Sequence, residues 1–332
     1  MTRNRLVVRL IDIDRPGAAF KNHCCKQGPI ILIKPKTIAA EEETNHLIHW
    51  PDSAEFRVNP TPNILIEAPP RWEALDLCEL WRYRELLYFL ALRDVTVRYK
   101  QTVIGAGWAI LQPFLTMVVF SVIFGELLKV PSDGVAYPVF SYAALVPWNF
   151  FAGALTRSGN SLIADANLIS KVYFPRLILP LSAVLSLILD FAIAFVILVV
   201  MMLFYHIVPS VAVLTLPLFL VLALITALAC GVWLSAVNIK YRDVAYVIPF
   251  LTQFWLFVTP VAYPSTIIPE PWRVFYGLNP MAGVVEGFRW ALLGQENPAW
   301  DLIFVSVLVV LALLISGLFY FRRMEHEFAD VV

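Results

Sequence analysis

The chain has 332 residues, of which 59% are hydrophobic and only 15% are charged, and its formal net charge is zero. Soluble domains have about 25% charged and 45–50% apolar residues, so a mean hydropathy of +0.72 excludes a disordered chain and a nucleic-acid-binding protein. Apolar runs of about 20 residues are long enough to cross a bilayer as helices. We therefore expect an all-α integral membrane protein.

Residues 1–70 differ from the rest of the chain and predict a weakly ordered cytosolic N-terminal extension. Prolines recur there without any sustained hydrophobic periodicity. The basic start is not followed by an apolar segment of signal-peptide length, so the first membrane helix is expected to act as an uncleaved anchor. His46 and His49 have metal-like spacing but no companion ligands, and we expect no metal site there.

Residues 71–102 predict an amphipathic interface helix that lies in the membrane surface. One stripe at helical spacing is apolar and aromatic: Leu77, Leu80, Trp81, Tyr88, Leu92, Val95 and Tyr99. Another face is charged: Arg82, Glu85, Arg93 and Lys100. Aromatic residues opposite basic ones are typical of interfacial helices. An ordinary soluble amphipathic helix is the alternative, and direct continuation into a membrane span disfavours it.

Six transmembrane helices are predicted within residues 103–323, and residues 324–332 form a cytosolic tail. The apolar runs cover residues 107–128, 137–155, 177–205, 211–237, 244–263 and 300–321. Prolines inside these runs are tolerated where neighbouring helices satisfy the freed backbone groups.

The loop charges predict the orientation. With a cytosolic N-terminus, the inner loops and tail hold seven basic residues: Arg157, Lys171, Arg176, Lys240, Arg242, Arg322 and Arg323. The outer loops hold only three: Lys129, Arg273 and Arg289. Since cytosolic loops are enriched in Lys and Arg, both termini are expected to be cytosolic.

The loop after the second span predicts a short amphipathic helix at about residues 161–170. Asn160 or Ser161 can cap it, with Asp165 near its first turn. Leu162, Ile169 and Tyr173 share one side of this helix. The helix is either a connector that rests on lipid headgroups or a docking element for a soluble partner.

The segment at about residues 264–293, before the last span, predicts short re-entrant helices in the outer leaflet. It is too apolar for a plain outer loop, yet prolines and charges break it into pieces too short to span. Broken helices at membrane depth must be shielded by protein. Gly283 and Gly287 have the spacing that permits close helix contact, although this spacing also arises by chance.

The motifs of common enzymes are absent from the sequence. It contains no G-x-x-x-x-G-K-[ST], H-E-x-x-H, G-x-S-x-G or C-x-x-C pattern, so the chain lacks the loop that cradles nucleotide phosphates. We expect neither a catalytic nor a metal site. Asp190 is the only acidic residue deep within a predicted span, with no basic residue expected at its depth. It is either functional, as intramembrane carboxylates often are, or a hydrogen-bonded structural group.

Several stretches between residues 72 and 321 resemble the membrane subunits of type-two ABC exporters. The similarity is greatest to the group that exports lipid-linked polysaccharides such as O-antigen, capsule or teichoic acid. The stretches are LLYFLALRDVTVRYKQTVIGAGWAILQPF, NLISKVYFPRLILP, NIKYRDV, FVTPVAYP and GLNPMAGVVEGFRWALLG.

This resemblance implies a transport subunit rather than an enzyme, in the cytoplasmic (inner) membrane of a bacterium. Two copies would pair with two copies of a soluble ABC ATPase, which binds the ATP and Mg²⁺, while this chain binds no cofactor. The helix at 161–170 would be the coupling helix. The implied contacts with the ATPase are Arg93, Asp94, Arg98, Tyr99, Lys100, Ser161, Asp165, Ile169, Lys171, Tyr241, Arg242 and Asp243.

The implied mechanism moves the half-transporters against each other and opens a path for the glycan along the dimer axis. Sugar C–H faces pack well on aromatic rings. Candidates for lining this path are Trp108, Phe120, Phe124, Trp148, Phe150, Phe151, Trp255 and Phe257. Each of them could instead face lipid or belong to an interfacial belt.

Other functions stay open at this point. The same machine could export a small molecule or drug. An ion-coupled secondary transporter would show internal repeats, and a membrane enzyme acting on lipid-linked sugars would need clustered catalytic groups. The sequence favours neither of these two.

Overall fold

The computed structural model describes residues 77–100, 106–241, 243–294 and 299–325, and in these residues it contains helices and turns but no strand. Helices satisfy their backbone hydrogen bonds internally, which a segment surrounded by lipid requires. The predicted extension at residues 1–70 lies outside the described residues, as does most of the predicted tail.

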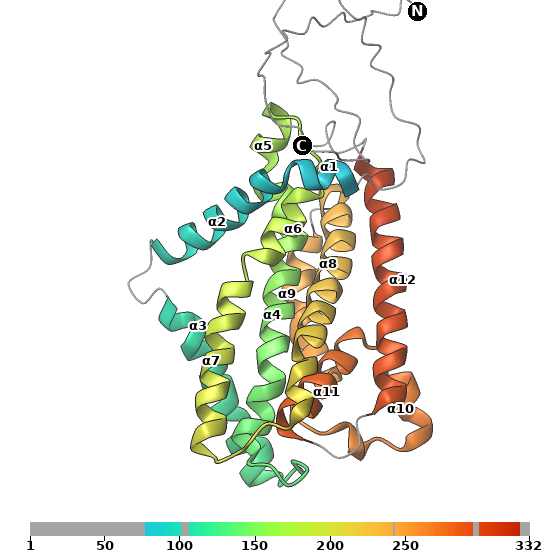
Figure 1. Ribbon diagram of the computed structural model, residues 1–332. Coiled ribbons are helices and arrows are strands. Elements are labelled where there is room, and N and C mark those ends of the chain that lie inside the picture. The colour runs from blue at the N-terminus through green and yellow to red at the C-terminus, as the bar shows by residue number, and fades with distance from the viewer. Residues whose placement is uncertain (1–76, 101–105, 242, 295–298, 326–332) are drawn as a thin grey trace, which may run out of the picture. The chain divides into compact units, whose positions relative to one another are not determined.

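The helices follow one another with short connections (Figure 1). In chain order they are α1 (Leu77–Arg82), α2 (Arg84–Lys100), α3 (Ala106–Phe120), η1 (Ser121–Leu127), α4 (Tyr137–Ala164), α5 (Ala166–Lys171), α6 (Ile178–Leu185), α7 (Ile188–Phe204), η2 (Val211–Thr215), α8 (Leu216–Lys240), α9 (Val244–Val258), η3 (Ser265–Ile267), α10 (Glu270–Tyr276), α11 (Pro280–Leu293) and α12 (Trp300–Glu325). In Figure 1, α1, α2 and α5 lie at one end of the bundle and α10 and α11 at the other. We call these the α5 end and the α10 end.

Five helical stretches of the described chain are long and apolar enough to span a membrane. They are Ile110–Leu127, Tyr137–Ala164, Ile178–Phe204, Val211–Lys240 and Trp300–Glu325, and they correspond to five of the six predicted spans. The remaining prediction, residues 244–263, is a 15-residue helix, α9. At 1.5 Å per residue α9 is about 22 Å long, shorter than a bilayer core of about 30 Å. A six-span topology therefore remains a prediction.

The third span is broken between α6 and α7, which the sequence did not predict. Two serine hydroxyls turn back onto the preceding helical turn: Ser182 donates to the Leu179 carbonyl at 2.9 Å and Ser186 to the Ala183 carbonyl at 2.8 Å. Such bonds compete with the backbone ladder and bend helices. The break lies at the level where α2 meets this span.

The prediction of a separate helix at residues 161–170 is wrong in its boundaries. Helix α4 continues to Ala164, and the short helix is α5, which begins at Ala166. Asn160 and Ser161 therefore lie inside α4 and cap nothing. Asp165 occupies the junction and makes no side-chain capping bond. The second predicted span and the short helix after it thus form one nearly continuous element.

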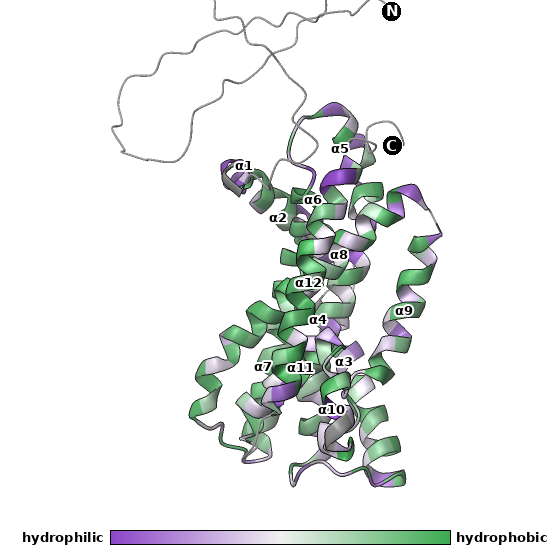
Figure 2. Cartoon of the chain, turned by 90° about the vertical axis from the view of Figure 1, so that its right-hand side faces the viewer, coloured by the Kyte–Doolittle hydropathy of each residue, from purple (hydrophilic) through white to green (hydrophobic). Residues whose placement is uncertain are grey.

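Helix α4 is the centre of the bundle. It packs against α3, α6, α7, α8, α9 and α11, and 78% of its candidate span is buried. No other candidate span of the described chain is buried beyond 28%, and these spans present apolar side chains outward, as the green outer helices of Figure 2 show. Apolar outer faces are what a lipid environment requires, because lipid offers charged side chains no solvation.

Small residues bring α4 and α8 into close contact. A Cβ atom added at Gly231 would lie 2.3 Å from the Ser158 hydroxyl oxygen, so only glycine fits there. The Asn238 amide of α8 donates to the Gly159 carbonyl at 2.9 Å and to the Asn160 side chain at 3.0 Å. Small residues and amide hydrogen bonds are the usual contacts between membrane helices.

The predicted small-residue pair of α11 does make close contacts, but with two different helices. A Cβ atom added at Gly283 would lie 2.6 Å from Cβ of Ser306 in α12, and one at Gly287 would lie 2.0 Å from Cε1 of Phe219 in α8. Helix α11 is thus wedged between α8 and α12 and is almost wholly buried.

Candidate functional site

Within the predicted interface helix, the described residues 77–100 form two helices, α1 and α2, interrupted at Tyr83, and their interfacial position remains a prediction. Trp81, Tyr88 and Leu92 of the predicted apolar stripe are exposed, and Leu90 is the buried residue of α2. Because nothing in the described part of the protein covers these apolar side chains, they are free to contact lipid. The polar side of α2 instead faces α5 and α7.

Arg93 joins α2 to the junction of α4 and α5. Its Nη2 atom donates to the carboxylates of Asp94 and Asp165, each at 2.9 Å. The hydrogen bond to Asp165 raises the pKa of Arg93 above its ordinary value. With 42% of the Arg93 side chain exposed, such a pair stabilises the fold by only about 0.2–1 kcal/mol. Its main effect is to hold α5 against α2.

A second link joins α2 to the third span. Arg98 and Tyr99 both donate to the carboxylate of Asp190 in α7. Nη2 of Arg98 also donates to the Ser186 hydroxyl at 3.2 Å, at the break between α6 and α7. Burial, followed by the hydrogen bond to Asp190, raises the pKa of Tyr99 to about 12. The expectation that Asp190 has no basic residue at its depth is therefore wrong.

The other predicted contacts lie at several places of the α5 end. Lys100 and Lys171 end α2 and α5 and are exposed, Ile169 is half-buried, and Tyr241 is exposed after α8. Ser161 is buried, and its hydroxyl donates to the Ser158 carbonyl at 2.8 Å. Asp243 is exposed, while Arg242 lies outside the described residues.

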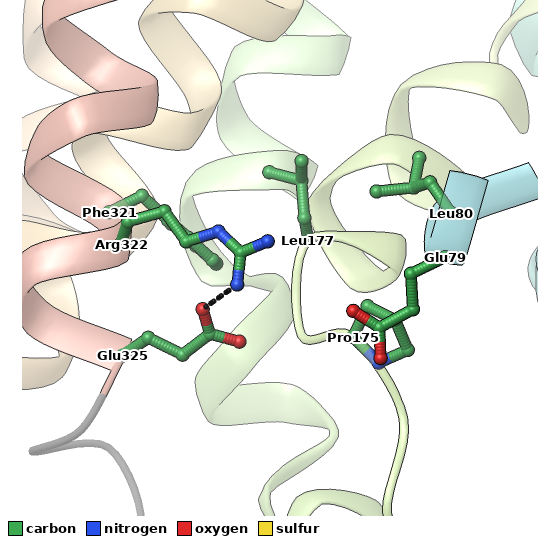
Figure 3. A pocket seen from close by; sticks show the side chains of 7 residues that line it. All are labelled: Glu79, Leu80, Pro175, Leu177, Phe321, Arg322 and Glu325. Carbon is green, nitrogen blue, oxygen red and sulfur yellow. Dashed lines mark hydrogen bonds and ion pairs between the residues drawn. The ribbon is translucent and has the colours of Figure 1, made fainter. Parts of the chain in front are cut away.

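Two cavities occur at the α5 end. The smaller, of about 10 Å³, lies where α1, the turn before α6 and the end of α12 meet (Figure 3). In Figure 3 the Arg322 and Glu325 side chains form an ion pair beside it, at 3.1 Å. Such a volume is only just enough for one water molecule, so this is a packing gap. The larger cavity, of about 400 Å³, lies between α2 and α4.

The predicted path residues divide by burial. Trp108 and Phe257 are exposed, Phe124 and Trp255 are half-buried, and the other four are buried in the core: Phe120, Trp148, Phe150 and Phe151. Within the chain these four pack against neighbouring helices; the Phe151 ring, for example, meets the Trp255 ring edge-on with centroids 5.2 Å apart.

Sequence reasoning named Phe257 but missed the other three residues of an aromatic face on α9. Tyr246, Phe250, Phe254 and Phe257 recur at intervals of four and three residues and are 83%, 72%, 60% and 56% exposed. Helix α9 lies at the edge of the bundle in Figure 2, and only its residue Ile248 is buried. The spacing was available in the sequence, but hydropathy alone does not tell which face of an apolar helix stays uncovered.

Arg289, which the sequence analysis counts among the outer-loop cations, is fully buried at the α10 end. Its guanidinium donates to the carbonyls of Pro260, Val261 and Tyr263, at 2.5, 2.6 and 3.1 Å. It also lies 3.7 Å from the ring centroid of Phe140. The arginine thereby fixes the turn that follows α9 to α4 and α11.

Metal-binding groups do not gather in the described part of the chain: no cluster of three or more His, Cys, Asp or Glu side chains occurs there. His46 and His49 lie outside it. The groups that remain for function are the α2 links, the α5 helix and the exposed aromatic face of α9.

Comparison with known proteins identifies the family. Residues 85–293 match the model of the ABC-2 type transporter family. The chain is 28% identical over 258 residues to the O-antigen export system permease protein RfbA of Myxococcus xanthus. The matched region covers 76% of this chain and 98% of that protein. It is likewise 28% identical to the RfbA protein of Klebsiella pneumoniae, over 75% of this chain and 95% of that one.

A more distant relative is the polysialic acid transport protein KpsM of Escherichia coli, 26% identical over 71% of this chain and 92% of its own length. The family match runs from α2 to the end of α11 and so includes the α2 links, α5, α9 and the buried Arg289. This chain belongs to the ABC-2 type transporter family of membrane proteins.

Proposed function

We propose that the chain is the transmembrane subunit of an ATP-driven exporter that moves lipid-linked polysaccharide across the inner membrane of a bacterium. The observation behind this proposal is the relatives at 26–28% identity, which are named for O-antigen export and polysialic acid transport and are matched over at least 92% of their length. The glycan would be of O-antigen, capsule or teichoic-acid type.

The ATP hydrolysis would come from a separate soluble ATPase with bound ATP and Mg²⁺. This is supported by the family, and by the absence of a phosphate-binding loop from the sequence. The ATPase would dock on the α5 end, which would face the cytosol together with both termini. On α5, the exposed Lys171 and the half-buried Ile169 would make this contact.

The ion pairs of α2 provide a route for coupling. Asp165 at the start of α5 binds Arg93, and five residues further along the same helix Arg98 binds Asp190 of α7. A push on α5 would therefore move α4 directly and the third span through α2. Because α2 is one rigid helix and makes both ion pairs, it would transmit a movement of α5 to α7 in the membrane domain.

Two copies of the chain would form the path. Each would contribute the aromatic face of α9 and the exposed Trp108 of α3. Aromatic rings bind the C–H faces of sugars without fixing one sugar sequence, which suits a polymer that must slide. Helices α10 and α11 would be the re-entrant helices of the outer leaflet, and α9 the fifth of the six spans.

Deletion of the gene tests the substrate. We expect surface polysaccharide to disappear from the native bacterium and to return with a plasmid copy. Unchanged polysaccharide together with newly gained drug sensitivity would instead identify a small-molecule exporter. If the purified chain moved substrate into vesicles without an ATPase, an ion-coupled carrier would be the better description.

Substitution on α5 tests the docking surface. We expect Ile169→Asp to lower co-purification of the ATPase by about tenfold, equivalent to about 1.4 kcal/mol, at unchanged membrane yield. Ile267→Asp is the matched control, because Ile267 is exposed at the α10 end. Wild-type recovery of the ATPase by the Ile169 variant would remove α5 from the interface.

A further inference from the structure

We propose that the larger cavity, between α2 and α4, binds the phosphate or diphosphate group of a membrane lipid. The cavity measures about 400 Å³ and is lined by Arg93, Asp94, Val97 and Arg98 from α2 and by Arg157 from α4. This volume lies in the range of ordinary ligand pockets. The proposal rests on the proposed function only where it assigns that lipid to the glycan substrate.

The charges around the cavity leave one cation without a partner among the described residues. Asp94 and Asp165 are bonded to Arg93, and Asp190 is bonded to Arg98 and Tyr99. Arg157 is exposed and makes no hydrogen bond or ion pair with any described residue. Each of these carboxylates is thus already paired with an arginine, whereas the guanidinium of Arg157 lines the cavity without such a pair.

An anion bound between α2 and α4 would reduce the repulsion between the arginine side chains that line the cavity. Arg157 shares the cavity with Arg93 and Arg98, and like charges repel one another. Of the Arg93 nitrogens, Nε and Nη2 bond to carboxylates, and Nη1 has no hydrogen-bond acceptor among the described residues. Guanidinium groups bind phosphate oxygens in pairs of parallel hydrogen bonds, so the available donors suit a phosphate better than a single carboxylate.

The position of the cavity points to a lipid phosphate. Arg157 is seven residues before the end of α4, and hence about 10 Å from it along the helix. Because the 28 residues of α4 make it about 42 Å long, close to the full thickness of a bilayer, Arg157 would lie near the boundary between the hydrocarbon core and the headgroups. Val97 lines the cavity and is 60% exposed, and Phe89, about two turns earlier on the same side of α2, is 63% exposed. A lipid could keep its chain in the membrane beside this surface while its phosphate entered the cavity.

The location at the α2 links has a consequence for transport. A phosphate bound by Arg157 and Arg93 would contact α4 and α2 at once, between the Arg93–Asp165 and Arg98–Asp190 pairs. A phosphate in the cavity would therefore contact α2, the same helix that connects α5 to α7. A lipid-linked glycan would be recognised by its linking phosphate, whatever its sugar sequence.

Binding to the purified full-length chain in nanodiscs tests the proposal. The probes are a short-chain polyprenyl diphosphate, the corresponding alcohol and phosphatidylglycerol. We expect the diphosphate to bind and the alcohol not to bind. Arg157→Gln should weaken diphosphate binding at least tenfold, and Arg157→Lys, which keeps the charge but loses the planar fork, should give an intermediate loss.

The matched control is Arg323→Gln, since Arg323 is an exposed arginine at the α5 end that does not line the cavity. It should bind the diphosphate within twofold of the wild type. Undiminished binding by Arg157→Gln, or an equal loss in the control, would overturn the site. Equally tight binding of phosphatidylglycerol would overturn the assignment to the glycan carrier.

The same variants separate this inference from the proposed function. In cells, Arg157→Gln should reduce surface polysaccharide while the ATPase still co-purifies at wild-type yield. If the gene deletion leaves surface polysaccharide unchanged, the proposed function fails, yet the loss of diphosphate binding by Arg157→Gln can still be measured. If polysaccharide export is normal in Arg157→Gln cells, the site has no part in export.

Discussion

Arg289 organises the α10 end through hydrogen bonds to main-chain carbonyls. The residues at 260–263 form a turn without helical partners for their carbonyls, and the buried guanidinium supplies these donors. Glu286 is the nearest carboxylate, at 3.8 Å, and it also accepts a hydrogen bond from Ser265. The buried charge is therefore compensated by carbonyl dipoles, a carboxylate and the Phe140 ring face.

Replacing Arg289 tests this arrangement. Arg289→Met should destabilise the fold by about 3–5 kcal/mol, because it leaves the buried Glu286 without its cation and several carbonyls without donors. The measurement is the midpoint of thermal denaturation in detergent. Arg289→Lys keeps the charge but reaches fewer carbonyls. Its denaturation midpoint should lie between those of the wild type and Arg289→Met. An unchanged midpoint in Arg289→Met would show that the turn does not depend on the arginine.

A double-mutant cycle tests the link between α2 and the third span. Arg98→Gln and Asp190→Asn should each lower stability, and the pair should couple by about 0.5–3 kcal/mol, as contacting charged residues do. The measurement is the denaturation midpoint of the wild type, both single variants and the double variant. Additive effects would mean that the ion pair does not hold α2 to α7.

Single-residue environments were the least predictable feature of the sequence. Arg98 and Asp190 are 92 positions apart, so a local pattern could not pair them, and Asp190 was expected to be isolated. Arg289 looks like an outer-loop cation because its partners are main-chain carbonyls, which carry no residue signature. Arg157 was counted as an ordinary inner-loop charge, although it lines a cavity.

Elements were predicted well wherever hydropathy alone determines them. The predicted spans at 107–128, 137–155, 177–205, 211–237 and 300–321 all correspond to candidate membrane-spanning helices. The breaks within helices and the exact helix ends were not predicted. They depend on local hydrogen bonds, such as that of the Ser186 hydroxyl, or on short connections between helices, such as the single residue Asp165 between α4 and α5. The length of α9 was overestimated for the same reason, since Thr259 begins an extended turn.

Close contact between α4 and α8 gives a prediction at the level of elements. Gly231→Ala should cost about 1–3 kcal/mol, since overpacking a tight contact forces backbone shifts and the added Cβ atom would lie only 2.3 Å from the Ser158 hydroxyl oxygen. Denaturation midpoints measure this. Ser158→Gly in the same chain should restore part of the loss by making room on the facing helix.

Gly153→Ala is the matched control, because its added Cβ would meet only Leu187, at an ordinary 3.4 Å. It should be neutral or slightly stabilising, since alanine favours helices over glycine. If Gly231→Ala behaved like Gly153→Ala, the close approach of α4 and α8 would not be a requirement of the fold.

At the scale of the whole molecule, the two ends of the bundle differ in chemistry. The α5 end holds the ion pairs of α2 and the exposed helix α5, whereas the α10 end holds the almost wholly buried α11 and the exposed α10, joined by turns (Figure 1). An ATPase can reach only the cytosolic end. Every step of the proposed coupling therefore depends on the α5 end lying in the cytosol.

Cysteine labelling tests that orientation. In a chain whose four cysteines are replaced, Ser170→Cys lies on α5, and Thr266→Cys lies in the exposed turn before α10. A membrane-impermeant maleimide should label Thr266→Cys in spheroplasts and Ser170→Cys only in inverted vesicles, because basic residues concentrate on the cytosolic side. Labelling of Ser170→Cys in intact spheroplasts would place α5 outside, where neither ATP nor a soluble ATPase could act on it.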